Sequence, residues 1–216
     1  MSSLSIVIIS KNEEAHIDQC LHSVLAAAAE IGGAEIIMVD SRSTDCTVKI
    51  AHSCGVRVLS LNPAWEMSAS AGRFVGFHQT RGELVMFVDG DTVIDRDWFR
   101  VAIPYFHQAD VAGMMGYLND FDAQGQKLPY VGKRSKQVST RPWLRGIGLY
   151  RRAAMIQVGT FNPYLSEEEE AELAFRLRRR GWRHSCIRSF PSSPSCSSRW
   201  LFRCLVRIRL GNRVYP

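Results

Sequence analysis

The sequence lacks any apolar run long enough to cross a bilayer, because no stretch approaches the roughly 20 apolar residues that a spanning helix needs. Its opening residues, MSSLSIVIISKNEE, lack the basic start and the small-residue cleavage site of a signal peptide. The 6 cysteines form no CxxC pair and no Cys/His zinc spacing, and none of the 6 histidines is assigned to a metal. These absences predict a cytoplasmic protein with reduced thiols.

The composition predicts a soluble chain with a substantial core, since 46% of the 216 residues are hydrophobic and 22% are charged. The net charge of +6 is spread unevenly, with Arg and Lys concentrated in residues 133–152 and 176–213. A basic end favours an anionic partner. No nucleic-acid-binding motif accompanies the charge, so we expect no nucleic acid. A peripheral contact of the basic tail with the inner face of the membrane is a further expectation.

Short β-branched runs alternate with helical spacing through residue 91. The run LSIVII predicts a strand buried on both faces. Ser10 and Asn12 then supply helix caps, with Glu13 and Glu14 in the expected first turn. This alternation predicts an α/β fold, a mostly parallel, Rossmann-like central sheet with helices on both faces. The expected strands are Leu4–Ile9, Glu35–Val39, Val56–Leu61 and Leu84–Val88, with helices at about 12–31, 44–53 and 66–80.

The pattern changes after residue 110. Strands are expected at Val111–Tyr117 and Gly146–Tyr150, with a long hairpin or mobile loop at 118–142 between them. Glu168–Arg180 predicts a helix, with acids at its start, arginines in its last turns and Gly181 as its stop.

The end of the chain does not continue this organisation. From Ser189 the sequence is rich in Ser and Pro, and LFRCLVRIRL then alternates apolar and basic residues, as in an edge strand or an amphipathic segment. We expect a main domain at residues 1–187 and an atypical basic tail at 188–216. A truncated or frame-shifted gene end is the hypothesis for this tail.

Polar residues follow three of the predicted strands. Residues 10–13 follow the first strand, Asp40 and Ser41 the second, and residues 89–91 the fourth. Parallel sheets bind ligands beyond the carboxyl ends of their strands. Since these segments reach the same sheet edge, the sequence predicts one binding site there.

The triplet Asp89-Gly90-Asp91 indicates a metal site. Both carboxylates can turn toward one point, where they repel each other unless a cation lies between them. Mg²⁺ and Mn²⁺ prefer oxygen ligands, and Mg²⁺ is commonly shared between carboxylates and substrate phosphates. The triplet therefore predicts Mn²⁺ or Mg²⁺ bound together with a diphosphate.

Several segments together carry a family resemblance. They are SIVIISKNEEAHIDQCLHSVL, EIIMVDSRSTDCTVKIA, SAGRFVGFHQTRGELVMFVDGD, GIGLYRRAAMIQVGTFNPYL and EEEEAELAFRLRRRGWR. In this order the chain resembles family 2 glycosyltransferases of the GT-A fold over about residues 4–187. The resemblance implies a nucleotide-diphosphate sugar as donor, and a hydroxyl of a glycan or a lipid-linked molecule as acceptor.

The resemblance also implies a role for individual residues. Asp89 and Asp91 would hold the metal, and Asp89 would also approach the ribose. An acid of the pair Glu169 and Glu170 would be the catalytic base, with Glu170 favoured by position. The implied nucleotide-sugar-binding residues are Ser10, Lys11, Glu13, Asp40, Ser41, Arg73, Asp89 and Gly90.

Two departures from the family pattern affect these assignments. Glycines usually stand at the positions of Arg42 and Cys46, so the turn after the second strand is expected to differ. The usual Glu-Asp pair lies here within a run of four glutamates, 167–170, which leaves the identity of the base open. Taken singly, that run could be an acidic first turn, Asp40 a turn cap, and Arg73 a surface residue.

The sequence predicts metal-dependent, inverting transfer of a sugar to an acceptor hydroxyl. One base on the face opposite the leaving group gives a single displacement, and hence inversion. A non-catalytic nucleotide-sugar-binding module, left by loss of C-terminal sequence, is the first alternative. A sugar nucleotidyltransferase is the second, but IISKNEE lacks the glycine-rich phosphate loop that such enzymes usually carry.

Overall fold

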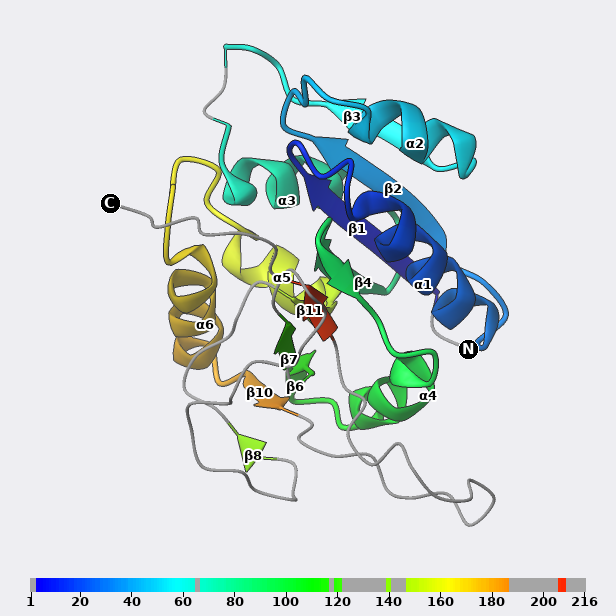
Figure 1. The fold of residues 1–216 in the computed structure, drawn as a ribbon. Coiled ribbons are helices and arrows are strands. Elements are labelled where there is room, and N and C mark those ends of the chain that lie inside the picture. The colour runs from blue at the N-terminus through cyan, green and yellow to red at the C-terminus, as the bar shows by residue number, and fades with distance from the viewer. Residues whose placement is uncertain are drawn as a thin grey trace.

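The computed structural model describes residues 3–64, 67–116, 119–121, 139–140, 147–186 and 206–208 (Figure 1). Most of the segment 118–142, most of the tail 188–216, and the residues Trp65 and Trp143 therefore lie outside the described residues. Within the described parts, no helix combines the length and the apolar character needed to cross a membrane.

The centre of the molecule is an eight-stranded sheet with the order β3-β2-β1-β4-β9-β6-β10-β8. β1 pairs in parallel with both β2 and β4, and β2 with β3, whereas β9 runs antiparallel between β4 and β6. The predicted mostly parallel α/β fold is confirmed. The strands are β1 (Leu4–Ser10), β2 (Glu35–Asp40), β3 (Arg57–Ser60), β4 (Leu84–Asp89), β6 (Val111–Met115), β8 (Ser139–Thr140), β9 (Gly148–Arg151) and β10 (Arg183–Cys186).

A second, three-stranded sheet has the order β5-β11-β7. It joins β5 (Thr92–Val93) and β7 (Asn119–Phe121) to β11 (Val206–Ile208). β11 lies within the predicted basic tail and runs antiparallel to β5 and parallel to β7. An edge strand was one of the two expectations for this stretch; β11 is a strand, but it forms the centre of the small sheet, because β5 and β7 pair with its two sides.

Helices cover both faces of the large sheet, as predicted (Figure 1). One core cluster joins α1 (Ile17–Ala29), α2 (Thr47–Ser53) and α4 (Trp98–Ala102) to one face, and the 3₁₀ helix η1 (Ile103–His107) follows α4. The other cluster joins α3 (Ala69–His78), α5 (Arg152–Val158) and α6 (Glu169–Arg179) to the opposite face. Trp98 is fully buried in the first cluster.

The first helix begins later than the sequence suggested. Residues 11–14 form a loop whose backbone N–H groups are taken by side chains from the segment before α2. Asn12 N donates to Ser43 Oγ at 2.8 Å, and Glu13 N donates to Thr47 Oγ1 at 2.8 Å. These partners satisfy N–H groups that a helix start would otherwise leave open, so the loop is held by the segment before α2, and α1 begins only at Ile17.

Helix α3 lies unusually close to β1, because it presents two glycines to the strand. A Cβ at Gly72 would lie 3.0 Å from Ile9 Cγ2, and one at Gly76 would fall far inside contact distance of Val7 Cγ1. The start of α3 is fixed by Ser68, whose side chain accepts a hydrogen bond from Ala71 N. The close packing of α3 against β1 brings Arg73, the residue after Gly72, toward the end of β4.

We predict that Gly76→Ala destabilises the protein, because the added methyl must push α3 away from β1. Overpacking of this kind costs about 1–3 kcal/mol. Urea unfolding of the variant and the parent measures the difference in free energy. His78→Ala changes an exposed residue of the same helix and should stay within about 0.5 kcal/mol of the parent. Equal stability of Gly76→Ala and the parent would contradict the close contact.

Candidate active site

A cleft of about 340 Å³ opens at the carboxyl ends of β1 and β4. The parallel register aligns the strand ends, since Ile9 pairs with Asp89 and Ser10 pairs with Asp40. The structure thus brings together all the predicted site residues except Asp40. The cleft is lined by Ile9, Ser10, Lys11, Glu13, Ser41, Met67, Ala69, Arg73, Asp89, Gly90, Asp91, Glu169 and Glu170.

Arg73 joins the two acidic parts of the cleft. Its Nη2 donates to Asp89 Oδ1 at 3.0 Å, its Nη1 lies 3.2 Å from Glu170 Oε1, and Nη1 also contacts Glu169 Oε1. The side chain is only 3% exposed, and its guanidinium carbon lies 5.6 Å from the centre of the Phe161 ring. Arg73 is therefore a buried cation held by carboxylates from β4 and α6, not a surface residue.

The pKa values of this cluster reflect both burial and charge. Burial lowers the pKa of Arg73, but the nearby charges of Asp89, Glu170 and Glu169 raise it overall, so the guanidinium stays charged. Burial raises the pKa of Glu170, and the negative charges of Glu169 and Asp89 add to this effect against the opposing charge of Arg73. Glu170 therefore takes up a proton more readily than an ordinary glutamate.

The two acids at the start of α6 differ in access. The Glu169 side chain is 7% exposed and is in direct contact with Arg73 Nη1, whereas that of Glu170 is 18% exposed at the longer distance. Both begin α6, where the helix dipole favours negative charge. Glu170 is thus the acid better placed to meet a molecule entering the cleft.

The floor of the cleft offers an unsatisfied hydroxyl. Ser10 Oγ is buried, and it has no hydrogen-bond partner among the described residues. Gly90 lies next to this hydroxyl and leaves room for it, because a Cβ at Gly90 would lie 2.9 Å from Ser10 Oγ. A buried polar group without a partner costs stability unless a ligand or a water satisfies it. The two residues therefore fit the close approach of a polar ligand.

Asp40 lies next to the cleft but does not line it. Its carboxylate accepts hydrogen bonds from Ser43 N at 3.0 Å and from Ser43 Oγ at 2.5 Å. It thereby closes the turn after β2. Asp40 is thus a turn cap, the role that the sequence offered as the alternative to nucleotide binding. Ser41, the next residue, does line the cleft.

Three residues of the loops around the cleft have positive φ angles although they are not glycines. They are Asn12 at 55°, Arg42 at 61° and Glu168 at 58°. Such angles cost energy for side chains other than glycine, and they occur preferentially at functional sites. Arg42 stands where the family pattern has glycine, and its φ angle lies in the left-handed region that glycine adopts most easily.

The cleft also contains residues that the sequence did not single out. Met67 and Ala69 line it next to Ser68, the cap of α3. Neither carries a chemical signal of its own. The cap at Ser68 was the one feature that could have placed them, since it fixes where α3 starts.

Comparison with known proteins decides the family. The model of the family described as Glycosyl transferase family 2 matches residues 5–165. The chain belongs to glycosyl transferase family 2. The match covers all of β1 but its first residue, the strands β2 and β4, and the residues that line the cleft except Glu169 and Glu170.

Two related proteins illustrate the range of similarity. Glycosyltransferase AglE of Haloferax volcanii is 23% identical over 205 residues, which cover 88% of this chain and 67% of AglE. The undecaprenyl-phosphate 4-deoxy-4-formamido-L-arabinose transferase of Pseudomonas aeruginosa is 34% identical over 93 residues, which cover 41% of this chain and 27% of that protein. The chain thus spans between about a quarter and two thirds of these relatives.

A solved structure shares the fold. The crystal structure of Staphylococcus aureus TarS 1–349 in complex with UDP-GlcNAc superimposes with a TM-score of 0.74 at 18% identity. The superposition covers 97% of this chain and 59% of the TarS chain. This agreement confirms the predicted GT-A fold of a family 2 glycosyltransferase.

We predict that Arg73→Met strongly destabilises the chain, because it leaves Asp89, Glu169 and Glu170 close together without their shared cation. Removing one partner from a buried ion pair costs about 3–5 kcal/mol. Chemical unfolding at several pH values measures the loss. The loss should shrink as the pH falls, since protonation relieves the repulsion among the three acids. A loss that is constant with pH would contradict this charge-based account.

The raised pKa of Glu170 gives a second pH dependence. At pH values below 4.5, the ordinary pKa of a glutamate, Glu170 is protonated both in the folded and in the unfolded chain. As the pH rises above 4.5, the unfolded chain loses this proton first, so the contribution of Glu170 to stability declines until the folded chain loses it too. Relative to the parent, Glu170→Gln should lack this decline. Equilibrium unfolding of both proteins across this range checks the sign.

Proposed function

We propose that this chain catalyses metal-dependent, inverting transfer of a sugar from a nucleotide-diphosphate sugar to an acceptor hydroxyl. One observation carries the proposal. The carboxylates of the DxD triplet on β4 and the acidic pair of α6 face the same cleft, and Arg73 bridges them. A single displacement at a sugar carbon needs a leaving-group site and a base within reach of one cleft, and these two groups of acids can supply both.

The donor would lie along the ends of β1 and β2. Lys11 and the hydroxyls of Ser10 and Ser41 line this side of the cleft and can bind the polar edges of a nucleotide. The complex of TarS with UDP-GlcNAc supports a nucleotide-diphosphate sugar as the ligand class. Asp40 would then act through the turn that it closes, by holding Ser41 in place.

The acids fit a hard divalent cation. Asp91 and Asp89 supply carboxylate oxygens, the ligands that Mn²⁺ and Mg²⁺ prefer, and Gly90 between them leaves space beside Ser10. When bound, the cation would offset the charge that develops on the leaving diphosphate. Asp89 also contacts Arg73, so the guanidinium fixes the orientation of this carboxylate.

Glu170 would act as the base. An acceptor hydroxyl becomes a competent nucleophile only as it loses its proton, and a positioned carboxylate contributes about 10²–10⁴-fold to such a step. Glu170 lines the cleft with part of its side chain exposed, and its raised pKa makes it a better proton acceptor than an ordinary glutamate. Glu169, held more tightly by Arg73, would position the start of α6.

The acceptor would be a glycan or a lipid-linked molecule. The relative named for undecaprenyl phosphate supports a lipid-linked acceptor, and the name of TarS as a poly(ribitol-phosphate) β-N-acetylglucosaminyltransferase supports a polymeric one. The hydroxyl to be glycosylated would enter beside Glu170, on the α6 side of the cleft.

The test is release of nucleoside diphosphate from a panel of UDP-, GDP- and dTDP-sugars, with Mn²⁺ and with candidate acceptors of both kinds. We expect release with one donor, loss of release with a chelator, and recovery on adding Mn²⁺. Asp91→Ala should raise the Mn²⁺ concentration needed, and Glu170→Gln should lower the rate by about 10²–10⁴-fold. Inversion is checked from the anomeric configuration of the product.

Glu167→Gln is the matched control, because Glu167 belongs to the same acidic run but is exposed and outside the cleft. Its rate should equal that of the parent. Donor binding without release, whatever the acceptor, would favour a binding module. Pyrophosphate release from a nucleoside triphosphate and a sugar phosphate would favour a nucleotidyltransferase.

A further inference from the structure

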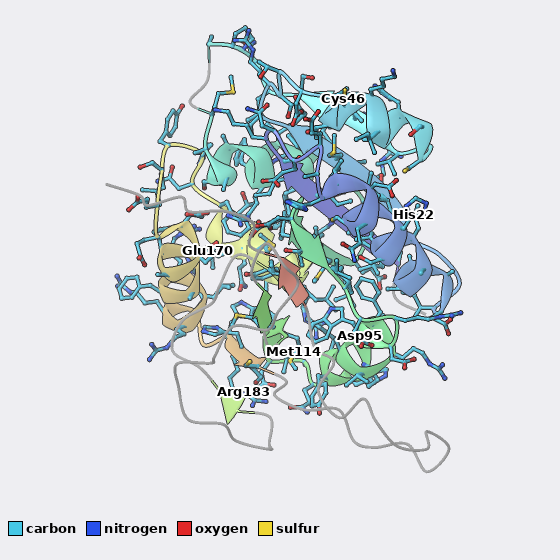
Figure 2. All side chains as sticks on the ribbon, in the orientation of Figure 1. His22, Cys46, Asp95, Met114, Glu170 and Arg183 are labelled. Carbon is cyan, nitrogen blue, oxygen red and sulfur yellow. The ribbon has the colours of Figure 1, made fainter. Side chains whose placement is uncertain are left out.

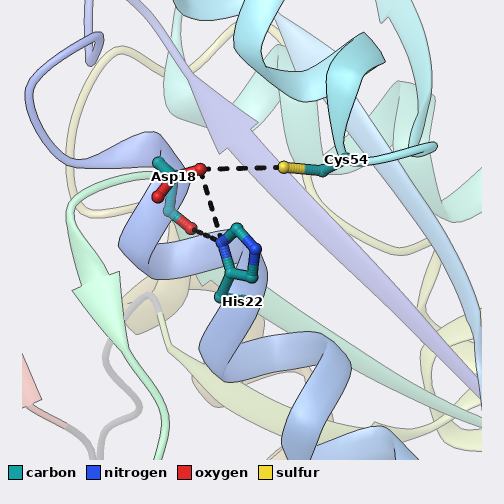
Figure 3. Close-up of side chains that lie close together, drawn as sticks. All are labelled: Asp18, His22 and Cys54. Atoms are coloured by element: carbon teal, nitrogen blue, oxygen red, sulfur yellow. Dashed lines mark hydrogen bonds and ion pairs between the residues drawn. The ribbon is translucent and has the colours of Figure 1, made fainter.

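Three side chains of the kinds that bind metal ions lie close together outside the cleft, between α1 and α2 (Figure 3). Asp18 and His22 stand four residues apart on α1, and Cys54 follows the last turn of α2. His22 Nδ1 lies 3.3 Å from Asp18 Oδ1, and Cys54 Sγ lies 3.9 Å from the same oxygen. One atom from each of the three residues lies within 4.8 Å of the others.

The fold holds these three side chains together. Leu21 and Val24 of α1 and Ala51 of α2 share one core cluster, with Cys54 packed against it. The packing of the two helices therefore fixes the spacing of Asp18 and His22 from Cys54. Both Asp18 and His22 have side chains about two thirds exposed, at 65% and 66%, so an ion from solution can reach them.

The distances match the geometry of a zinc-type ion. Bonds of about 2.0–2.3 Å from a tetrahedral ion to oxygen, nitrogen and sulfur place the ligand atoms about 3.3–3.8 Å apart. The two contacts of Asp18 Oδ1, 3.3 Å to His22 Nδ1 and 3.9 Å to Cys54 Sγ, are close to this range. Small side-chain rotations would suffice to complete the arrangement.

We propose that Asp18, His22 and Cys54 bind a zinc-class divalent ion, with water in the fourth position. The thiol of Cys54 would release its proton to solvent on binding, and His22 would bind through Nδ1 with its proton on Nε2. His22 Nδ1 would exchange its present contact with the Asp18 carbonyl oxygen, at 2.9 Å, for the ion.

The choice of ion follows from the ligands. A thiolate and an imidazole favour Zn²⁺ and Co²⁺ over the harder Mg²⁺ and Mn²⁺. The acids of the cleft offer oxygen only, so the two sites would select different metals. The new site is remote from the proposed base, as the positions of His22 and Glu170 on opposite sides of the sheet show (Figure 2).

Such a site would connect α1 to α2. The buried side of α1 carries Cys20, whose thiol lies 3.7 Å from the carbonyl oxygen of Asp89. An ion on the outer side of α1 would therefore brace the helix that packs behind the DxD triplet. Its role would be structural, and it does not depend on the proposed transfer reaction.

The test titrates the metal-free full chain with Co²⁺ and records the ultraviolet thiolate-to-cobalt charge-transfer band. We expect the band to reach its maximum at one equivalent and to disappear when Zn²⁺ is added. Cys54→Ser should abolish it, and His22→Gln should raise the dissociation constant by about tenfold or more. Zn²⁺ should raise the melting temperature of the parent but not of Cys54→Ser.

Two matched controls change the same residue types at α2, in its helix and at its amino-terminal cap. Cys46→Ser and His52→Gln, both at exposed positions, should keep the band and the affinity. Asp91→Ala should also keep both, which separates this site from the cleft. A titration without a charge-transfer band, a full band in Cys54→Ser, or loss of the band in Cys46→Ser would each overturn the proposal.

Discussion

The site depends on burying one guanidinium among three carboxylates from two distant parts of the chain. Arg73 meets Asp89 from β4 and the pair Glu169 and Glu170 from α6, in surroundings from which water is largely removed. Three acids this close would repel one another strongly without the cation, and the cation would be costly to bury without the acids. Each element is therefore held in position by the charges of the others.

The same arrangement links the two halves of the proposed chemistry. Asp89 shares the DxD triplet with Asp91, and Glu170 is the proposed base, so the leaving-group side and the acceptor side of the cleft are tied through a single side chain. The glycines of α3 make this possible, because a helix seated further from β1 would carry Arg73 away from Asp89. Packing at the sheet and electrostatics at its edge thus depend on each other.

Much of the fold followed from sequence pattern. The apolar runs predicted the strands, their alternation with helices predicted the parallel sheet, and its carboxyl edge collected Ser10, Ser41 and Asp91 into one cleft. The departures come from contacts between distant residues. Asn12 and Glu13 look like a helix start until Ser43 and Thr47 take up their N–H groups.

The surroundings of charged residues were harder to predict. An arginine on a helix is ordinarily exposed, whereas Arg73 is buried because Asp89 and the distant acids of α6 surround its guanidinium. The cluster of Asp18, His22 and Cys54 was missed for the same reason, since the thiol lies 36 positions beyond Asp18. The sequence pattern predicts local helices and strands well, but it does not indicate which side chains far apart in the sequence will become neighbours in the fold.

The order of the strands has a consequence for synthesis on the ribosome. β1 to β4 come from one continuous stretch ending at Asp89, so the donor side of the sheet can form while the remainder is still being made. Glu169 lies 96 positions beyond Arg73. We therefore expect the nascent amino-terminal half to carry a guanidinium that still lacks two of its counterions, and the emergence of α6 to complete its neutralisation.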